Sequence, residues 1–424
     1  MDRREENELL TRTGPGTAMG DLLRRYWIPA LLARELPGPD CPPVRVQLLG
    51  ERLVAFRDTE GKLGLIDEFC AHRRVSLWFG RNEECGLRCP YHGWKYDTTG
   101  QCVDLPSHPD HAPRIKLKSY PCLEQGDVIW TYMGPPDLRP APPAYEWSLV
   151  PHERLFISKR LQECNYLQAV EGGIDSSHVA FLHGGALRSD PLLAGSKGNQ
   201  YTDQDRAPVF EVEEFSGGLL IAVRRTIADE RYYWRITPWL APFYTLIPPR
   251  GRNPVSGHAW VPIDDEHCWA WSLSYHPRRP LTDRERAAME AGHGIHVRYI
   301  PGTFVPEANK ANNYLMDRNA QKAGLLYSGV QGIGMQDASL QESMGSIVDR
   351  SLENLVSTDR GIVMMRRMLA RAATANRDGG EIPGLEVTAQ QVRSCAIELP
   401  RGTPFEEGAR AGLFPELFSE PVTV

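Results

Sequence analysis

The chain has 424 residues, of which 41% are hydrophobic and 24% are charged, and its formal net charge is −6. This length allows two domains or one large elaborated domain, and its basic residues occur in isolated pairs that do not indicate a nucleic-acid surface. The sequence shows no apolar stretch long enough to cross a bilayer and no signal-peptide pattern, so we expect a cytoplasmic protein.

The N-terminal third of the chain predicts a small β domain. Residues 17–34 are expected to form a short helix that ends at or before Pro29, because proline lacks the backbone donor that a helix interior needs. Short β-branched runs follow over 44–58 and again over 127–134, separated by turn residues. Proline becomes frequent over 134–147, which indicates a linker.

The rest of the chain predicts a mixed domain. Residues 160–183 and 336–373 have helical patterns, and 208–276 alternate as antiparallel strands do. Thr282 and Glu285 match a capping box, which predicts the start of another helix. The sequence therefore predicts an α+β fold with three parts: an N-terminal helical segment over 1–43, an antiparallel β domain over 44–143, and a larger domain over 144–424.

Two pairs of metal-ligating side chains lie within residues 70–94. Cys70-x-His72 and Cys89-x-x-His92 each join one thiolate to one imidazole. A structural zinc site, the alternative, usually keeps its cysteines in one pair and its histidines in the other. A [2Fe-2S] cluster with one iron on both cysteines and the other on both histidines needs the mixed pairing, because each loop must reach both irons. The remaining cysteines are scattered, and we expect them to be reduced.

The stretches "CAHR" and "CPYHGW" resemble the two ligand loops of Rieske iron–sulfur domains. The resemblance implies that these four side chains hold a [2Fe-2S] cluster whose histidine ligands raise its reduction potential. Arg74 departs from the pattern, because many relatives carry glycine at this position after the "CxHR" motif.

A second group of metal-binding side chains lies within 164–185. Asp175, His178 and His183 place a carboxylate and two imidazoles within nine residues. His178 and His183 are five residues apart, which is about 140° around an ideal helix. If both bind one metal, the helix must loosen between them, a distortion often found at functional sites. Taken alone, the motif also fits a plain helix with two incidental histidines.

Together, the two motifs resemble the alpha subunit of Rieske non-haem iron aromatic-ring-hydroxylating oxygenases, and the resemblance covers essentially the whole chain. It implies a catalytic domain built on an antiparallel sheet flanked by helices, of the helix-grip type. It also implies that His178 and His183 bind a mononuclear ferrous iron. Asp175 corresponds to the family's bridge for electron transfer from a Rieske histidine of a neighbouring subunit, and we expect His92 rather than His72 to be that histidine.

The third iron ligand is expected far downstream, in the segment "GMQDASLQESMG". Asp337, followed five residues later by Glu342, is similar to the family's carboxylate segment and is our candidate. Asp317, Asp349 and Asp359 are the competing acids.

The runs over 79–109, 167–183 and 341–359 resemble the phthalate 4,5-dioxygenase-like branch. The branch implies a homotrimer or a stacked hexamer that receives electrons from a separate NADH-dependent reductase carrying flavin and an iron–sulfur centre. We expect a terminal oxygenase that uses O2 to cis-dihydroxylate an aromatic carboxylate of the phthalate or substituted-benzoate type. The alternatives are a monooxygenase or O-demethylase, a diaryl-ether-cleaving oxygenase and, from another class, a Rieske electron carrier without oxygen chemistry.

An aromatic carboxylate also needs a cation, and a guanidinium fork suits it well. Five arginines lie on or beside the predicted strands of the catalytic domain or shortly before them, and we expect at least one to contact the substrate: Arg206, Arg231, Arg235, Arg250 and Arg252.

Overall fold

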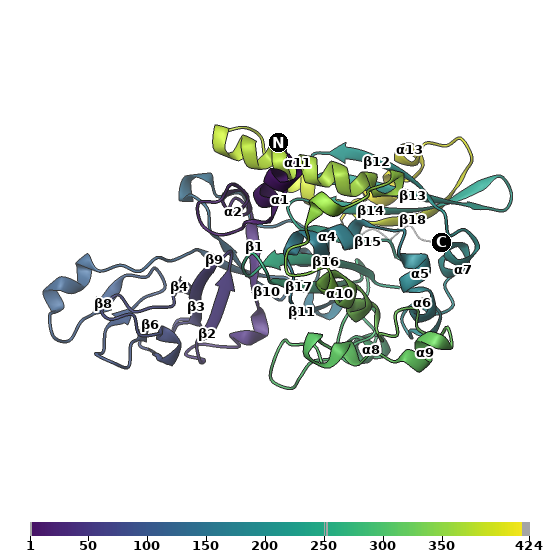
Figure 1. The fold of residues 1–424 in the computed structure, drawn as a ribbon. Helices are drawn as coiled ribbons and strands as arrows, with labels where there is room; N and C mark the ends of the chain where they lie inside the picture. The colour runs from purple at the N-terminus through teal and green to yellow at the C-terminus, as the bar shows by residue number, and fades with distance from the viewer. Residues whose placement is uncertain (1, 250, 252, 418–424) are drawn as a thin grey trace. The chain divides into compact units, whose positions relative to one another are not determined.

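The structure is a computed structural model that describes residues 2–249, 251 and 253–417 (Figure 1). The chain forms two compact units. One unit comprises Thr13–Pro142, and the other comprises Met1–Arg12 together with Pro143–Val424. The N-terminal segment is therefore divided between the two units, with its first helix in the larger one. Among the described residues, no helix combines the length and apolar character needed to cross a membrane.

The smaller unit consists of three small antiparallel sheets. The first has the order β1-β10-β9, the second β2-β3-β4 and the third β5-β6-β7-β8. The strands are β1 (Trp27–Leu32), β2 (Val44–Leu48), β3 (Glu51–Arg57), β4 (Leu63–Asp67), β5 (Arg81–Glu83), β6 (Gly86–Arg88), β7 (Lys95–Tyr96), β8 (Cys102–Asp104), β9 (Cys122–Gln125) and β10 (Val128–Tyr132). The helices are α2 (Ala18–Leu23) and the short 3-10 turns η1 (Ala33–Glu35), η2 (Leu77–Phe79), η3 (Pro109–Arg114) and η4 (Pro136–Leu138).

The larger unit is built on an eight-stranded antiparallel sheet in the order β11-β17-β16-β15-β14-β13-β12, with β18 paired to β14. Its strands are β11 (Leu155–Gln162), β12 (Val209–Phe215), β13 (Gly218–Ile227), β14 (Arg231–Leu240), β15 (Tyr244–Ile247), β16 (Val255–Pro262), β17 (Cys268–Tyr275) and β18 (Cys395–Pro400). The strands at the centre of the sheet are almost wholly buried, for example β14 and β16.

Helices pack on this sheet, as Figure 1 shows for α11 along β12 and β13. The α-helices are α1 (Arg3–Thr11), α3 (Glu146–Leu149), α4 (Tyr166–Ile174), α5 (Val179–Leu182), α6 (Gly184–Ser189), α7 (Lys197–Gln204), α8 (Asp283–Glu290), α9 (Arg318–Lys322), α10 (Ile333–Ser343), α11 (Arg360–Asp378), α12 (Val387–Gln390), α13 (Phe405–Gly408) and α14 (Arg410–Leu413). Four 3-10 turns accompany them: η5 (His152–Arg154), η6 (Lys310–Leu315), η7 (Arg350–Leu352) and η8 (Ser357–Asp359).

Two of the predicted helical regions are wrong in extent. The helix expected from residue 160 begins at Tyr166, because β11 continues to Gln162 in register with β17 and Asn165 then caps α4 by accepting from the Leu167 amide. The long helix expected over 336–373 is two helices, α10 and α11, separated by an irregular segment. The capping box of Thr282 and Glu285 is confirmed at the start of α8.

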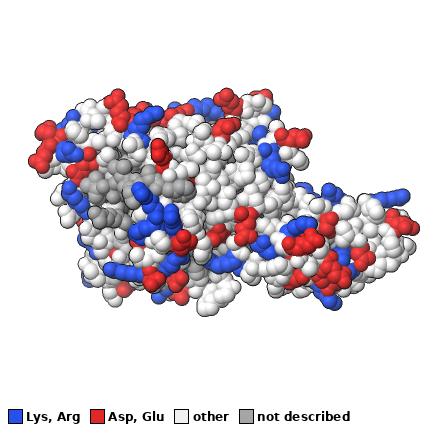
Figure 2. All heavy atoms as spheres, turned by 180° about the vertical axis from the view of Figure 1, so that it is seen from behind, with Lys and Arg blue, Asp and Glu red and all other residues white. Residues whose placement is uncertain are grey.

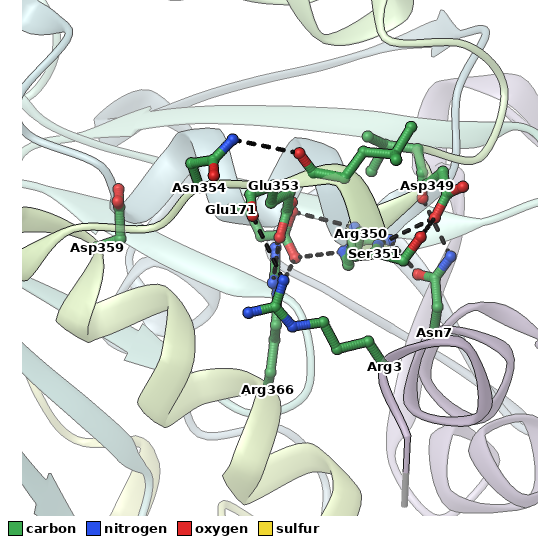
Figure 3. A network of polar contacts seen from close by, with 12 residues as sticks. Arg3, Asn7, Glu171, Asp349, Arg350, Ser351, Glu353, Asn354, Asp359 and Arg366 are labelled. Atoms are coloured by element: carbon green, nitrogen blue, oxygen red, sulfur yellow. Dashed lines mark hydrogen bonds and ion pairs between the residues drawn. The ribbon is translucent and has the colours of Figure 1, made fainter.

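A buried ionic cluster ties α4 to the C-terminal helices (Figure 3). Glu171 of α4 accepts hydrogen bonds from Arg350 of η7, at 3.0 Å from both Nε and Nη2, and from Arg366 Nε of α11 at 2.7 Å. Arg350 Nη1 also donates to Asn7 of α1 at 2.7 Å. Because these charges are buried and paired, the cluster fixes the position of α4, the helix that leads into the Asp175 motif.

Candidate metal centres and the cavity beside them

The helical backbone is interrupted within the Asp175 motif, which comprises Asp175, His178 and His183. Asp175 is the C-cap of α4 in an extended conformation, and His178 precedes the four-residue helix α5. His183 lies between α5 and α6 with φ −99° and ψ −6°, so the two histidines are not on one continuous helix. This interruption lets both imidazoles turn toward the same point.

The structure brings His178, His183 and Asp337 together. His178 Nε2 lies 3.1 Å from His183 Nε2, and Asp337 Oδ1 of α10 lies 3.0 Å from His183 Nε2 and 3.5 Å from His178 Nε2. One donor atom from each residue falls within 4.8 Å of the other two. Two imidazole nitrogens and one carboxylate with open positions beside them are the donor set expected for a ferrous iron that reacts with dioxygen.

The second nitrogen of each histidine is held by a neighbouring side chain. His183 Nδ1 lies 2.8 Å from Gln336 Oε1, and the Gln336 amide nitrogen donates to the Val330 carbonyl at 3.0 Å. Gln336 therefore accepts from His183 Nδ1, which leaves the Nε2 lone pair free for a metal. His178 Nδ1 lies 3.4 Å from Asp175 Oδ2. The sequence did not single out Gln336, although it directly precedes Asp337.

Electrostatics at this group favour a bound cation. Burial acts to raise the pKa of Asp337, but the charges of His183 and His178 outweigh burial and lower the pKa to about 2. Burial acts to lower the pKa of His178, but Asp175 and Asp337 outweigh it and the pKa is raised. The Asp337 carboxylate therefore stays ionised although it is buried. A bound metal ion would stabilise its negative charge as protonated imidazoles do.

The competing acids are used elsewhere. Asp317 caps α9 by accepting from the Asn319 and Ala320 amides, and Asp349 accepts from the Ser351 amide. The Asp359 carboxylate accepts from the Val356 amide. Each of these carboxylates serves a local turn, so the geometry favours Asp337 among the four candidates.

The predicted cluster ligands lie on two loops of the smaller unit. Cys70 and Cys89 are buried in its apolar core, whereas His72 and His92 are exposed. The two imidazoles face each other, with 3.0 Å between their Nδ1 atoms. Buried thiolates beside outward-facing imidazoles fit a [2Fe-2S] cluster that has one inner and one outer iron. The Tyr96 hydroxyl lies 3.2 Å from Cys70 Sγ, within hydrogen-bond reach of this predicted ligand.

Arg74 has a left-handed backbone conformation, with φ +59°. Glycine adopts this region at no steric cost, whereas a side chain with a Cβ is strained there. This conformation explains why glycine suits the position. Arg74 compensates in part by donating to the Phe69 carbonyl and stacking on the Phe69 ring.

A cavity of about 120 Å³ opens beside the His178, His183 and Asp337 group. This is comparable to the roughly 150 Å³ that encloses a benzene ring. Apolar side chains of Leu187, Leu193 and Ile333 line it together with Arg235 of β14. Its lining of apolar side chains with one arginine suits an aromatic ring that carries an anionic group.

Arg235 is the one predicted arginine, among those described, that lines the cavity. It is 5% exposed, its Nη1 is buried without a hydrogen-bond partner, and no described acid pairs with it. Arg206 is exposed and lies over the Phe181 ring, and Arg231 is bound to Glu398. Arg250 and Arg252 fall outside the described residues.

A second arginine, which the sequence did not suggest, lies beside Arg235. Arg225 of β13 is 1% exposed and donates through Nε to the Asp205 carbonyl, and its buried Nη1 has no hydrogen-bond partner in the described part of the chain. Burial and the charge of Arg235 lower the pKa of Arg225 to about 10. Val223 pairs with Arg235 across the sheet, so the two arginines project from the same face. The proximity of Arg225 and Arg235 follows from the pairing of β13 with β14, which could not be predicted from the sequence.

Comparison with known proteins gives consistent matches along the chain. Residues 26–121 match the family described as "Rieske [2Fe-2S] domain", and residues 131–401 match that described as "LigXa C-terminal domain like". The 3-chlorobenzoate-3,4-dioxygenase oxygenase subunit of Comamonas testosteroni is 38% identical over 393 residues, 89% of this chain and 90% of that protein. The phthalate 4,5-dioxygenase oxygenase subunit of Pseudomonas putida is 38% identical over 407 residues, 93% and 91% of the two proteins.

The fold is also that of a solved structure. Dicamba monooxygenase bound to 3,6-dichlorosalicylic acid superimposes with a TM-score of 0.56 at 19% identity, covering 84% of this chain and 98% of that one. Enzymes of this fold and family contain a Rieske cluster and a mononuclear iron, which are therefore the cofactors of this protein. The chain belongs to the Rieske non-haem iron oxygenases, as an oxygenase alpha subunit of the branch that includes phthalate 4,5-dioxygenase.

Proposed function

We propose that this protein is the terminal oxygenase for a single-ring aromatic carboxylate and that it inserts both atoms of O2 by cis-dihydroxylation. The observation that carries the substrate class is Arg235, whose buried Nη1 has no hydrogen-bond partner among the described residues, in the wall of the cavity that His178, His183 and Asp337 also line. An unpaired buried charge is costly, and a substrate carboxylate would neutralise it. The relatives named for 3-chlorobenzoate and phthalate dioxygenation support the same reaction class.

In this proposal His178, His183 and Asp337 hold the mononuclear iron, and Cys70, His72, Cys89 and His92 hold the cluster. When bound, the iron activates dioxygen and the cluster supplies single electrons. Gln336 keeps His183 in the tautomer that binds metal through Nε2, and Asp175 orients His178 in the same manner.

The cavity residues orient the substrate. Arg235 binds the carboxylate, with Arg225 adding positive potential from the neighbouring strand. Leu187, Leu193 and Ile333 hold the ring and exclude water from the reacting carbons. The fixed distance between the carboxylate anchor and the metal group then determines which ring positions are attacked.

Electrons are proposed to enter from another subunit. His72 and His92 are exposed, and the neighbouring Tyr91, whose ring lies against that of His92, is exposed with them. Such a surface suits contact with a second copy of the chain, in which Asp175 receives the electron from His92. We propose a homotrimer, alone or stacked as a hexamer, served by an NADH-dependent reductase with flavin and an iron–sulfur centre. Acidic and basic side chains are interspersed on the face in Figure 2, which fits protein partners rather than nucleic acid.

The test compares a carboxylate with its uncharged amide. Arg235→Gln should weaken binding of benzoate-type ligands roughly 10- to 100-fold, because a hydrogen bond to a charged group contributes about 1.5–3 kcal/mol. Benzamide analogues should bind equally to both proteins, as measured by isothermal titration calorimetry. Arg231→Gln is the matched control, since Arg231 is already bound to Glu398. Equal carboxylate binding by wild type and Arg235→Gln would refute the proposal.

A further inference from the structure

His258 of β16 is a second polar side chain in the wall of the cavity. It is 5% exposed and lines the cavity together with Arg235, Trp260 and Asp337. The register of the sheet places it between Thr245 of β15 and Ser272 of β17. The proposed function assigns no role to His258.

The hydrogen bonds of His258 fix which ring nitrogen carries the proton. Nδ1 lies 3.1 Å from the Trp271 carbonyl oxygen, which can only accept, so Nδ1 must carry a hydrogen. Ser272 Oγ also lies 3.1 Å from Nδ1, but its own hydrogen goes to the Ile295 carbonyl at 3.3 Å. Ser272 therefore accepts from Nδ1 as well, and the neutral ring has a bare lone pair on Nε2.

The lone pair on His258 Nε2 has no hydrogen-bond partner among the described residues. His258 Nε2 makes no hydrogen bond with any other residue that the structure describes, whereas both nitrogens of the nearby His296 are bound, by Ser158 at 2.8 Å and Ser274 at 3.0 Å. Burial and the charge of Arg160 lower the pKa of His258 to about 3. The ring is thus uncharged at neutral pH and can accept a hydrogen bond in the cavity but cannot donate one from Nε2.

We propose that His258 Nε2 accepts a hydrogen bond from a hydroxyl or amino group on the substrate ring, so that the preferred substrate is a hydroxy- or amino-substituted aromatic monocarboxylate. This inference rests on the proposed function, because Arg235 must bind the carboxylate while His258 accepts a hydrogen bond from a second substituent. A second ionised carboxylate has no hydrogen to give to this lone pair. At the position that faces His258, a hydroxyl or amino group is therefore favoured over a second carboxylate.

The selection has a clear energetic basis. A ring that lacks a donor at the right position leaves the buried acceptor unsatisfied, which is costly, whereas a hydroxyl or amino group satisfies it. Sites built to bind a substrate hydroxyl discriminate strongly against analogues that lack it. We expect a hydroxybenzoate to bind roughly tenfold tighter, or more, than the fluorobenzoate of the same substitution pattern, because fluorine has a similar volume and no hydrogen to donate.

The experiment measures dissociation constants of the ortho, meta and para hydroxybenzoates and of the matching fluorobenzoates by titration calorimetry on the cofactor-loaded protein. For at least one isomer, the wild type should favour the hydroxyl roughly tenfold. His258→Leu should reduce that ratio to near unity, and His258→Gln, which retains an acceptor oxygen, should restore part of it. Ser256→Ala is the control, because Ser256 lines the same wall.

Three results would overturn the inference: ratios near unity for all isomers in the wild type, a ratio that survives His258→Leu, or a ratio that Ser256→Ala abolishes instead. Unchanged absorbance of the cluster and unchanged iron content would show that the variants are folded. Arg235→Gln separates this inference from the proposed function. If it leaves benzoate binding unaffected, the carboxylate proposal fails; if carboxylates depend on Arg235 but the hydroxyl preference is absent, only the role of His258 fails.

Discussion

The two nitrogens of His183 have different partners, and this division prepares the residue for a metal. Nδ1 is bound to Gln336, whose amide is itself fixed by the Val330 carbonyl, and Nε2 faces His178 and Asp337. A ligand whose tautomer and orientation are set in advance loses little entropy when the metal binds. In the proposed site, Gln336 would therefore influence the metal through His183.

Replacing Gln336 with Leu should weaken mononuclear iron binding about 10- to 100-fold, because His183 loses the partner that fixes its tautomer. The dissociation constant for ferrous iron, measured by titration of the iron-depleted protein, checks this expectation. Asp337→Ala should abolish iron binding at this centre in the same assay while leaving the cluster spectrum intact. Wild-type affinity in Gln336→Leu would show that the hydrogen bond has no such role.

Helix α4 is held in place by charges that come from distant parts of the chain. Glu171 lies in the clamp formed by Arg350 and Arg366, and both arginines are themselves buried (Figure 3). Burial acts to raise the pKa of Glu171, but the two arginines outweigh burial and the pKa is lowered. The ion pairs therefore stabilise the folded protein at neutral pH.

Glu171→Ala should destabilise the protein by about 3–5 kcal/mol at pH 7, because it leaves two buried arginines without their shared partner. Urea denaturation measures this difference. Glu214→Ala is the control, since Glu214 pairs with Arg371 on the surface and its loss should cost no more than about 1 kcal/mol. A loss for Glu171→Ala as small as that of the control would contradict the clamp.

The ion pairs of Glu171 with Arg350 and Arg366 also predict how the free energy of unfolding depends on pH. A carboxylate whose folded pKa is lowered contributes stability above its ordinary pKa of 4.5, and this contribution is lost as the pH falls below 4.5 toward the folded value. The difference in unfolding free energy between wild type and Glu171→Gln should therefore be constant near neutral pH and shrink below pH 4.5. A difference that grows on acidification would have the wrong sign for this assignment.

Candidate ligands could be chosen from local sequence motifs, whereas the extent of strands and the lining of the cavity depend on contacts between distant segments. The cluster loops and the Asp175 motif are each encoded within a few residues, so their spacing could be interpreted directly. The extent of β11 could not, because its pairing with β17 is decided more than a hundred residues downstream. Arg225 and His258 were missed for the same reason, since their neighbours in the cavity come from other strands.

Among the predicted arginines, only folding separates Arg235 from Arg206 and Arg231, and Arg250 and Arg252 lie outside the described residues. Arg235 lies within β14 and lines the cavity, whereas Arg231, four residues earlier at the start of the same strand, reaches Glu398 on β18. The assignment of the N-terminal helix to one of the two units also could not be predicted from the sequence. Nothing in the first twelve residues indicates that α1 belongs with the larger unit, where it contacts α4, η7 and α11.

Electron transfer between subunits can be tested by complementation in the assembled protein. In the proposed assignment, His92→Ala removes a cluster ligand and Asp337→Ala removes an iron ligand, so each variant alone should be inactive. Co-expressed, they should form mixed oligomers in which an intact cluster of one subunit serves an intact iron site of the next. Recovered product formation supports transfer across the interface. Mixed oligomers without activity, at confirmed subunit mixing, would indicate transfer within one subunit.

The most direct test of the proposed reaction is oxygen consumption by the protein with a phthalate-type reductase and NADH, across a panel of hydroxy-, amino-, chloro- and methoxybenzoates, phthalates and uncharged aromatic amides. Products would be identified by mass spectrometry with isotopically labelled O2. We predict uptake that depends on a ring carboxylate, with both labelled oxygen atoms in the product. Incorporation of a single atom, loss of a methyl group, or no substrate-dependent uptake despite a reducible cluster would contradict the account.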